Sequence, residues 1–219
     1  PIGTFLSGGL DSSLITAVCA AHSDGKGQNL PTFSLDFLDN DKYFVPGKFQ
    51  PSSDHEYILK MQQTLQTDHH WTVLTPQDLM DSLEAATMAR DLPGMADVDF
   101  SLLSFCGKIS EHVKVALSGE CADEIFGGYP WFHKKECLEA HTFPWTMDLK
   151  PRCAMLSDDF LEVLQMEEYV RETYEKSVAE TPRLAGESKE EARRREISYL
   201  NQKWFMQTLL DRMDRTSMH

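Results

Sequence analysis

The fold is decided by one stretch near the amino terminus, Ile2-Gly3-Thr4-Phe5-Leu6-Ser7-Gly8-Gly9-Leu10-Asp11-Ser12-Ser13-Leu14-Ile15. Its apolar start, IGTFL, is typical of a buried strand. Ser7, Gly8 and Gly9 then let the backbone turn tightly, and LDSSLITAVCAA over 10–21 has a helical pattern. A helix that starts directly after a glycine turn presents free backbone N–H groups and the positive end of its dipole. We therefore expect an anion site at this turn.

The side chains of this loop indicate which anion it binds. No Lys-Ser/Thr pair follows the glycines, so the loop is not a Walker A loop. It has instead the hydroxyls of Ser7, Ser12 and Ser13, which can donate to phosphate oxygens, and the carboxylate of Asp11. A carboxylate cannot face a phosphate without a cation between them, so we expect Mg²⁺ as the bridge. The alternative is an ordinary strand-to-helix connection with serine caps.

Strand and helix patterns alternate through the first half of the chain. Strands are predicted over 30–37, 69–74 and 114–118. Helices are predicted over 54–66 and 100–112. A further helix is predicted to start at Thr75, with Leu79, Leu83 and Ala86 on one face. Loops are predicted over 38–53 and 91–99. This alternation predicts an α/β fold with a mainly parallel sheet and flanking helices. Ligands bind at the carboxyl ends of such strands, so the turn after residue 118 should share an edge with the glycine loop.

Strand patterns stop at Trp131, and the rest of the chain is predicted to be a helical C-terminal part. An irregular stretch over 133–151 precedes a helix capped by Ser157, a second helix to about Ala179, and a charged helix from Lys189. Residues 197–213 carry Leu200, Trp204, Phe205 and Leu209 at helical spacing, so this segment should pack inward.

Two motifs carry a resemblance to a known family. SGGLDSS is the signature of the PP-loop ATP pyrophosphatases, and LSGECADEIFGGY over 117–129 closely resembles a block of the asparagine synthetase domain. RDLPGMADVD and LLDRMDRTSM resemble that family too, so the likeness covers residues 1–219. It implies a nucleotide-binding core over 1–130 and a helical extension over 131–219. The chain would be the central part of a synthetase domain, without the family's N-terminal glutaminase domain and C-terminal remainder.

The resemblance also implies an activity and a site. The family adenylates the β-carboxylate of aspartate with ATP, releasing pyrophosphate, and ammonia then displaces AMP to give asparagine. ATP and Mg²⁺ are the implied cofactors, with Asp11 and Asp123 as metal ligands. The implied catalytic residues are Glu120, which would handle a proton or orient the adenylate, and Arg212 and Arg215, which would line the intermediate or the pyrophosphate. The implied nucleotide-binding residues are Leu6, Ser7, Gly8, Gly9, Asp11, Ser12, Ser13, Leu35, Asp36, Ser118, Gly119 and Tyr129.

Several alternatives stay open at this point. The two arginines could instead form a surface pair with Asp211 and Asp214. Cys121 stands where the family block has Gly, and we expect it to fill space and not to act as a catalytic thiol. The whole chain could be a non-catalytic ATP-binding fragment, or a sister PP-loop ligase such as a β-lactam synthetase. Aspartate-dependent formation of AMP would distinguish an active ligase from a non-catalytic fragment. The carboxylate substrate would distinguish an asparagine synthetase from a sister ligase.

Composition and net charge argue against some classes of binding partner. The 219 residues carry a net charge of −14, which argues against a nucleic-acid surface. No apolar run is long enough to span a bilayer, so no membrane partner is expected. Five cysteines without CxxC spacing fit reduced thiols in the cytoplasm, and the pair His69-His70 should be buried in its strand. The expected partners are ATP, aspartate and ammonia, with a glutaminase domain in the full-length protein and a homodimer as a further option.

Overall fold

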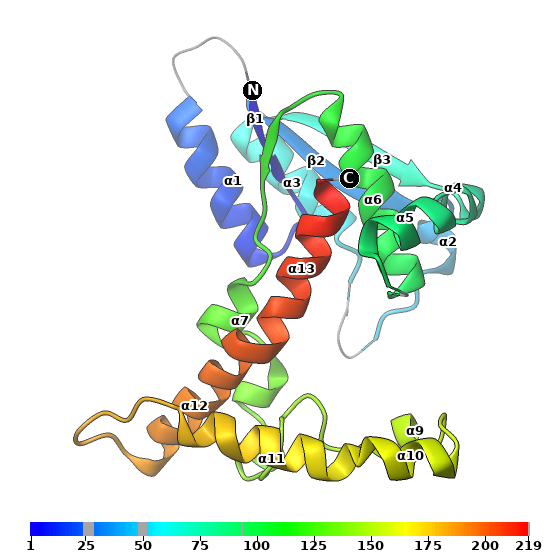
Figure 1. The fold of residues 1–219 in the computed structure, drawn as a ribbon. Coiled ribbons are helices and arrows are strands. Elements are labelled where there is room, and N and C mark those ends of the chain that lie inside the picture. Colours follow the sequence, from blue (N-terminus) through cyan, green and yellow to red (C-terminus); the bar gives the residue numbers. More distant parts are fainter. Residues whose placement is uncertain (24–28, 48–51, 93, 219) are drawn as a thin grey trace. The chain divides into compact units, whose positions relative to one another are not determined.

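The computed structural model describes residues 1–23, 29–47, 52–92 and 94–218 of the chain (Figure 1). These residues form two compact units by their contacts. The first unit comprises Pro1–Glu120 and Leu210–His219, and the second comprises Cys121–Leu209. The predicted division of the chain at residue 130 remains a prediction.

A four-stranded parallel sheet forms the centre of the described part of the first unit. Its strands lie in the order β3-β2-β1-β4, and they are β1 (Ile2–Phe5), β2 (Pro31–Phe37), β3 (Asp68–Leu74) and β4 (Val115–Leu117). The predicted α/β fold with a mainly parallel sheet is confirmed. From β1 the chain moves outward through β2 and β3 and then returns to the other side of β1. The strand order therefore reverses between β1 and β4, and a crevice for a ligand is expected at the carboxyl ends of these two strands.

Helices cover both faces of the sheet. On one face lie α1 (Leu10–Ser23) and α3 (His55–Leu65), where Thr4 on β1 and Thr16 on α1 share a buried hydrogen bond of 2.9 Å. On the other face lies α6 (Ala96–Ser110), whose Phe105 and Ile109 pack with Phe33 of β2 in a buried apolar cluster. The unit also contains α2 (Asn40–Tyr43), α4 (Pro76–Asp81), α5 (Leu83–Arg90) and the carboxyl-terminal end of α13 (Met206–Ser217).

Three local predictions for this unit are wrong in detail. The helix that starts at Thr75 has the expected capping box with Asp78, but it ends at Ser82, whose hydroxyl donates to the carbonyl of Asp78. Leu83 then begins α5 and is exposed, although Ala86 is buried as predicted. The predicted link over 91–99 is helical from residue 96, and the predicted loop over 38–53 contains α2.

The described residues of the second unit contain no strand. Its helices are α7 (Ala122–Phe126), η1 (Pro130–Phe132), α8 (Lys135–Leu138), α9 (Lys150–Cys153), α10 (Asp158–Leu164), α11 (Met166–Ala179), α12 (Lys189–Leu200) and the π-helical segment η2 (Asn201–Phe205). Phe143, Tyr174 and Leu200 form its buried core. The predicted cap of Ser157 is confirmed, and so is the helical C-terminal part. In the part of the chain that the structure describes, no helix is both long and apolar enough to cross a membrane.

Candidate active site

The glycine loop begins where β1 ends, and Leu6 anchors it. The Leu6 side chain is 1% exposed, its backbone N–H donates to Phe33 O at 2.8 Å, and its carbonyl accepts from the hydroxyl of Ser34. These two bonds extend the pairing of β1 and β2 by one residue. The loop therefore leaves the sheet from a fixed point at its carboxyl edge.

The loop is held in shape by its own hydroxyl groups. Ser12 Oγ accepts from the backbone N–H of Ser7 at 3.2 Å, lies 2.9 Å from Ser7 Oγ, and donates to Gly9 O at 3.2 Å. Gly8 has φ +79°, and a Cβ there would lie 2.9 Å from Tyr57 Cβ and 3.0 Å from Asp54 O, so this position requires glycine. Of the three serines, Ser12 is buried and fastens the loop, whereas Ser7 is exposed.

The second motif turns directly beside the first. Ser118 Oγ accepts from the backbone N–H of Glu120 at 3.1 Å, which fixes the turn after β4. A Cβ on Gly119 would lie 2.9 Å from the backbone N of Ser12 and 3.0 Å from Asp11 Cβ. The absence of a side chain on Gly119 lets the two loops touch at the first turn of α1. The structure thus brings together Ser7–Ser13 and Ser118–Glu120, as the sequence predicted for strand ends at one edge.

Two of the predicted catalytic residues form an ion pair in the first unit. Arg212 Nη2 lies 3.3 Å from Glu120 Oε1, and their side chains are 18% and 31% exposed. Arg212 Nε is buried and makes no hydrogen bond within the described residues. The guanidinium group of Arg212 places a positive charge beside the second loop, where it would favour an anionic ligand.

Arg215 has other partners. Its Nε donates to Asp211 Oδ1 at 2.7 Å, and its Nη1 donates to Asp91 Oδ2 at 3.1 Å. The hydrogen bond from Arg215 is the largest of the effects that lower the pKa of the Asp211 carboxyl, and the charges of Arg215 and Arg90 add to it. The contact with Asp91, 124 residues away in the sequence, has no local signal in the sequence.

The predicted adenine contacts lie at the end of the neighbouring strand. Leu35 and Asp36 are near the carboxyl end of β2, which pairs with β1. Asp36 Oδ1 accepts from Phe37 N at 2.8 Å and from Asn40 Nδ2 at 2.7 Å. The Asp36 side chain thus holds the start of α2, and an adenine contact by this segment would use backbone groups.

From Cys121 onward, the second motif belongs to the second unit. Asp123 lies in the first turn of α7, and Tyr129 donates to Glu124 Oε1 at 2.7 Å while stacking on Trp131. Glu124 is 1% exposed and was not foreseen, although a Tyr five residues after an acidic residue was the available signal. The roles of Asp123 and Tyr129 in a nucleotide site remain predictions.

Cys121 adopts a left-handed backbone with φ +71°. Such a backbone costs an L-residue about 1–2 kcal/mol relative to its right-handed form, a cost that glycine avoids. A glycine, which stands at this position in the block that the motif resembles, would avoid this cost. The thiol is buried, in agreement with a space-filling role.

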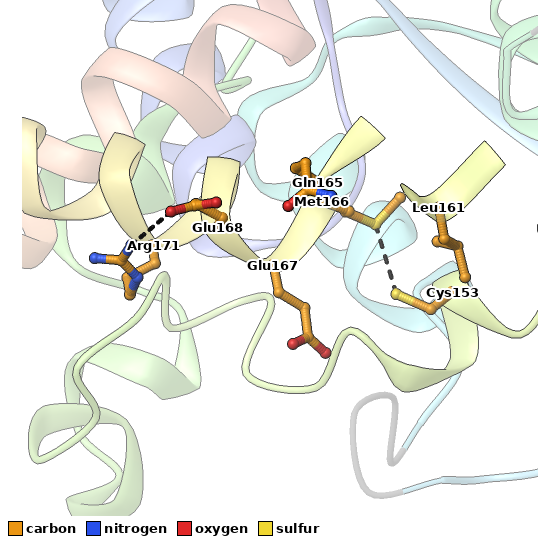
Figure 2. Close-up of a pocket in the computed structure, with 7 residues that line it drawn as sticks. All are labelled: Cys153, Leu161, Gln165, Met166, Glu167, Glu168 and Arg171. Carbon is orange, nitrogen blue, oxygen red and sulfur yellow. Dashed lines mark hydrogen bonds and ion pairs between the residues drawn. The ribbon is translucent and has the colours of Figure 1, made fainter. Parts of the chain in front are cut away.

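A hollow of about 610 Å³ in the second unit is lined by residues of α9, α10 and α11. Figure 2 shows the side chains that line it. Cys153 Sγ lies 3.8 Å from Met166 Sδ there, and Arg171 pairs with Glu168 at 3.4 Å. None of the predicted site residues lines this hollow, and its acidic side chains do not suit a nucleotide. The loops at the sheet edge, which combine backbone N–H groups, hydroxyls and an arginine, are therefore the better candidate.

Mg²⁺ fits the residues present at these loops. It prefers oxygen ligands and usually binds through one or two carboxylates together with substrate phosphates and waters. Within the described residues, no group of three or more His, Cys, Asp or Glu side chains is placed to hold a metal by itself. Asp11, in the first turn of α1 beside Gly119, offers one such carboxylate.

The fold and the two loops define an α/β protein of the PP-loop type, in which the two motif loops meet at the carboxyl ends of β1 and β4. The family model described as asparagine synthase matches residues 1–219, and the chain belongs to that family. This chain is 51% identical over 219 residues to glutamine-hydrolyzing asparagine synthetase 3 of Bacillus subtilis. The matched region covers all of this chain and 35% of that relative.

Plant relatives are more distant. Identity is 30% over 192 residues to the glutamine-hydrolyzing asparagine synthetase of Asparagus officinalis, covering 74% of this chain and 30% of that protein. It is 34% over 152 residues to the enzyme of the same name from Zea mays, covering 64% of this chain and 24% of that protein. The chain therefore spans about a third or less of the length of the curated relatives it matches.

Proposed function

We propose that this chain is the ATP-binding and carboxylate-activating part of an amide ligase that makes asparagine from aspartate and ammonia. The observation that carries the proposal is the contact between the loop after β1 and the turn after β4, where Gly119 lies against Ser12 and Asp11. Both loops lie at the reversal of strand order, where α/β sheets bind their ligands. The names of the relatives support the choice of product.

In the first step, an oxygen of the aspartate β-carboxylate attacks the α-phosphorus of ATP. The bond from that phosphorus to the bridging oxygen breaks, and pyrophosphate leaves with the electron pair. The backbone N–H groups of the glycine loop and the hydroxyls of Ser7 and Ser13 bind the departing pyrophosphate. Asp11 would hold Mg²⁺, which supplies charge neutralisation when bound. Backbone groups at Leu35 and Asp36 would hold the adenine.

In the second step, the lone pair of ammonia attacks the acyl carbon of the β-aspartyl adenylate, and the carbon–oxygen bond to AMP breaks. The attacking nitrogen must lose a proton, and Glu120 is the acceptor that we assign. Arg212, paired with Glu120, and Arg215 bind the anionic adenylate or the pyrophosphate. Ser118 and Gly119 would lie near the ribose or the α-phosphate of the nucleotide. In the full-length protein a glutaminase domain would supply ammonia, and a cytoplasmic location follows from this metabolism.

Calorimetry of ATP binding tests the nucleotide site. We expect Asp11→Asn, or removal of Mg²⁺ with EDTA, to weaken ATP binding by about thirtyfold, because one charged ligand contact contributes on the order of 2 kcal/mol. Asp158→Asn is the matched control, since Asp158 also lies in the first turn of a helix, α10, and should leave the affinity unchanged. An ATP affinity that ignores both the Asp11 change and EDTA contradicts the assignment of Asp11.

A further inference from the structure

A chain of charged residues holds the carboxyl-terminal end of α13 within the first unit. Asp211 accepts from Arg90 Nη1 at 3.0 Å and from Arg215 Nε at 2.7 Å. Arg215 continues to Asp91 at 3.1 Å, and Arg90 Nε lies 3.5 Å from Asp99 Oδ2. We call these five residues the charged network. It ties α13 to the end of α5 and the start of α6.

The inner end of the charged network is buried and its outer end is exposed. The side chains of Arg90 and Asp99 are 18% and 3% exposed, whereas that of Asp91 is 80% exposed. The carboxylate oxygens of Asp99 make no hydrogen bond within the described residues, so the positive charge of Arg90 is needed to stabilise the buried carboxylate. A buried charge that loses its partner is costly, whereas an exposed pair contributes little. Among the pairs of the charged network, those made by Arg90 therefore contribute most to its stability.

The same end of α13 also carries Arg212, which pairs with Glu120. Asp211 and Arg215 are four residues apart and lie on one side of the helix, and Arg212 lies on the adjacent side. Thr216, which is 1% exposed, donates to the carbonyl of Arg212 at 2.7 Å and fixes the same turn. Because a helix rotates as a unit, the bond from Arg90 to Asp211 also sets where Arg212 points.

We propose that Arg90 is a positioning residue, which through Asp211 orients α13 so that Arg212 meets Glu120. This inference rests on the proposed function, in which Glu120 and Arg212 act on the acyl adenylate. Arg90 lies outside the two motif loops and reaches the chemistry through the helix alone. Its removal should thus act on the same step as removal of Arg212.

A double-mutant cycle in the full-length protein tests the proposal. The rate of pyrophosphate release from ATP, Mg²⁺ and aspartate is measured for the wild type, Arg90→Met, Arg212→Met and the double variant. We expect Arg90→Met to lower kcat/KM for aspartate about tenfold, and the double variant to be no slower than Arg212→Met. Arg194→Met is the matched control, because Arg194 pairs with Glu190 on the exposed side of α12, and it should leave the rate unchanged.

One further variant and two crystal structures keep the result decisive. Asp211→Asn removes the bridging carboxylate at a half-exposed position and should reproduce the Arg90→Met loss, even if Arg90→Met folds poorly. Losses that multiply in the double variant, or a wild-type rate in Asp211→Asn, overturn the proposal. Crystal structures of the wild type and Asp211→Asn give the Arg212–Glu120 distance whatever the reaction is, and a pair unchanged in the variant also overturns it. A wild-type protein that releases no pyrophosphate refutes only the proposed function.

Discussion

His69 shows how one partly buried side chain makes this fold sensitive to acid. Its Nδ1 lies 2.8 Å from Thr32 Oγ1, and its Nε2 is buried without a hydrogen-bond partner in the described part of the chain. The pKa of His69 is lowered from 6.5 to about 4, mainly by burial and then by the nearby charge of His70. The charge of Asp68 opposes this shift, and His55 makes a smaller contribution in the same direction as His70. The neutral imidazole is therefore the form that the folded protein accepts.

The sign of the resulting pH dependence follows from this pKa. Between pH 6.5 and about 4 the unfolded chain binds a proton on His69 that the folded protein does not, so stability falls as the pH falls through this range. After allowance for solvent screening at this half-exposed ring, we expect His69 to account for about 1–2 kcal/mol of that loss. Urea unfolding of the wild type and His69→Gln at pH 7 and pH 4.5 measures it. His22→Gln, on the exposed end of α1, should keep the wild-type dependence; the same dependence in His69→Gln would contradict the account.

At the scale of elements, the site depends on the close approach of two loops. Gly119→Ala would place a methyl group within 3.0 Å of backbone N in α1, so the loops must separate. We expect a loss of ATP affinity of about tenfold or more, measured by calorimetry with Mg²⁺. The unfolding midpoint should change little, since both loops lie at the sheet edge.

Gly107→Ala is the control for this change. Gly107 lies within α6, and a Cβ there would meet nothing within 4 Å. Alanine should leave ATP binding unchanged and stabilise the helix by about 0.5–1 kcal/mol. Equal ATP affinities for both alanine variants would show that the loops do not need to touch.

The sheet and its two motif loops were predictable because their signals are local. An apolar run, two glycines and a capped helix lie within fifteen residues, and the parallel sheet then places both loops at one edge. The break at Ser82 was missed because it depends on a hydrogen bond from one side chain to the backbone. The early start of α6 was missed because no side-chain cap marks it; its N-cap residue is Met95. The charged network was not predictable, since Arg90 and Asp211 are 121 residues apart and the approach of α13 is a tertiary event.

At the scale of the whole molecule, the chain is acidic and corresponds to about a third of its Bacillus subtilis relative. In the proposed function, residues of this chain bind the nucleotide and activate the carboxylate, and another domain supplies the ammonia. The central claim is accordingly about one bond: ATP is cleaved between its α and β phosphates. The loop has no Walker A lysine, and we propose that its hydroxyls and N–H groups hold a departing pyrophosphate, which would account for that choice.

Chromatography of the nucleotides formed by the full-length protein tests this claim most directly. With ATP, Mg²⁺, aspartate and ammonium, we expect AMP, pyrophosphate and asparagine in equal amounts, and no AMP when aspartate is omitted. AMP formed only with a different carboxylate would indicate a sister ligase, and intact ATP would indicate a binding module without catalysis. ADP and orthophosphate as the products would contradict the account of the loop and of the site built on it.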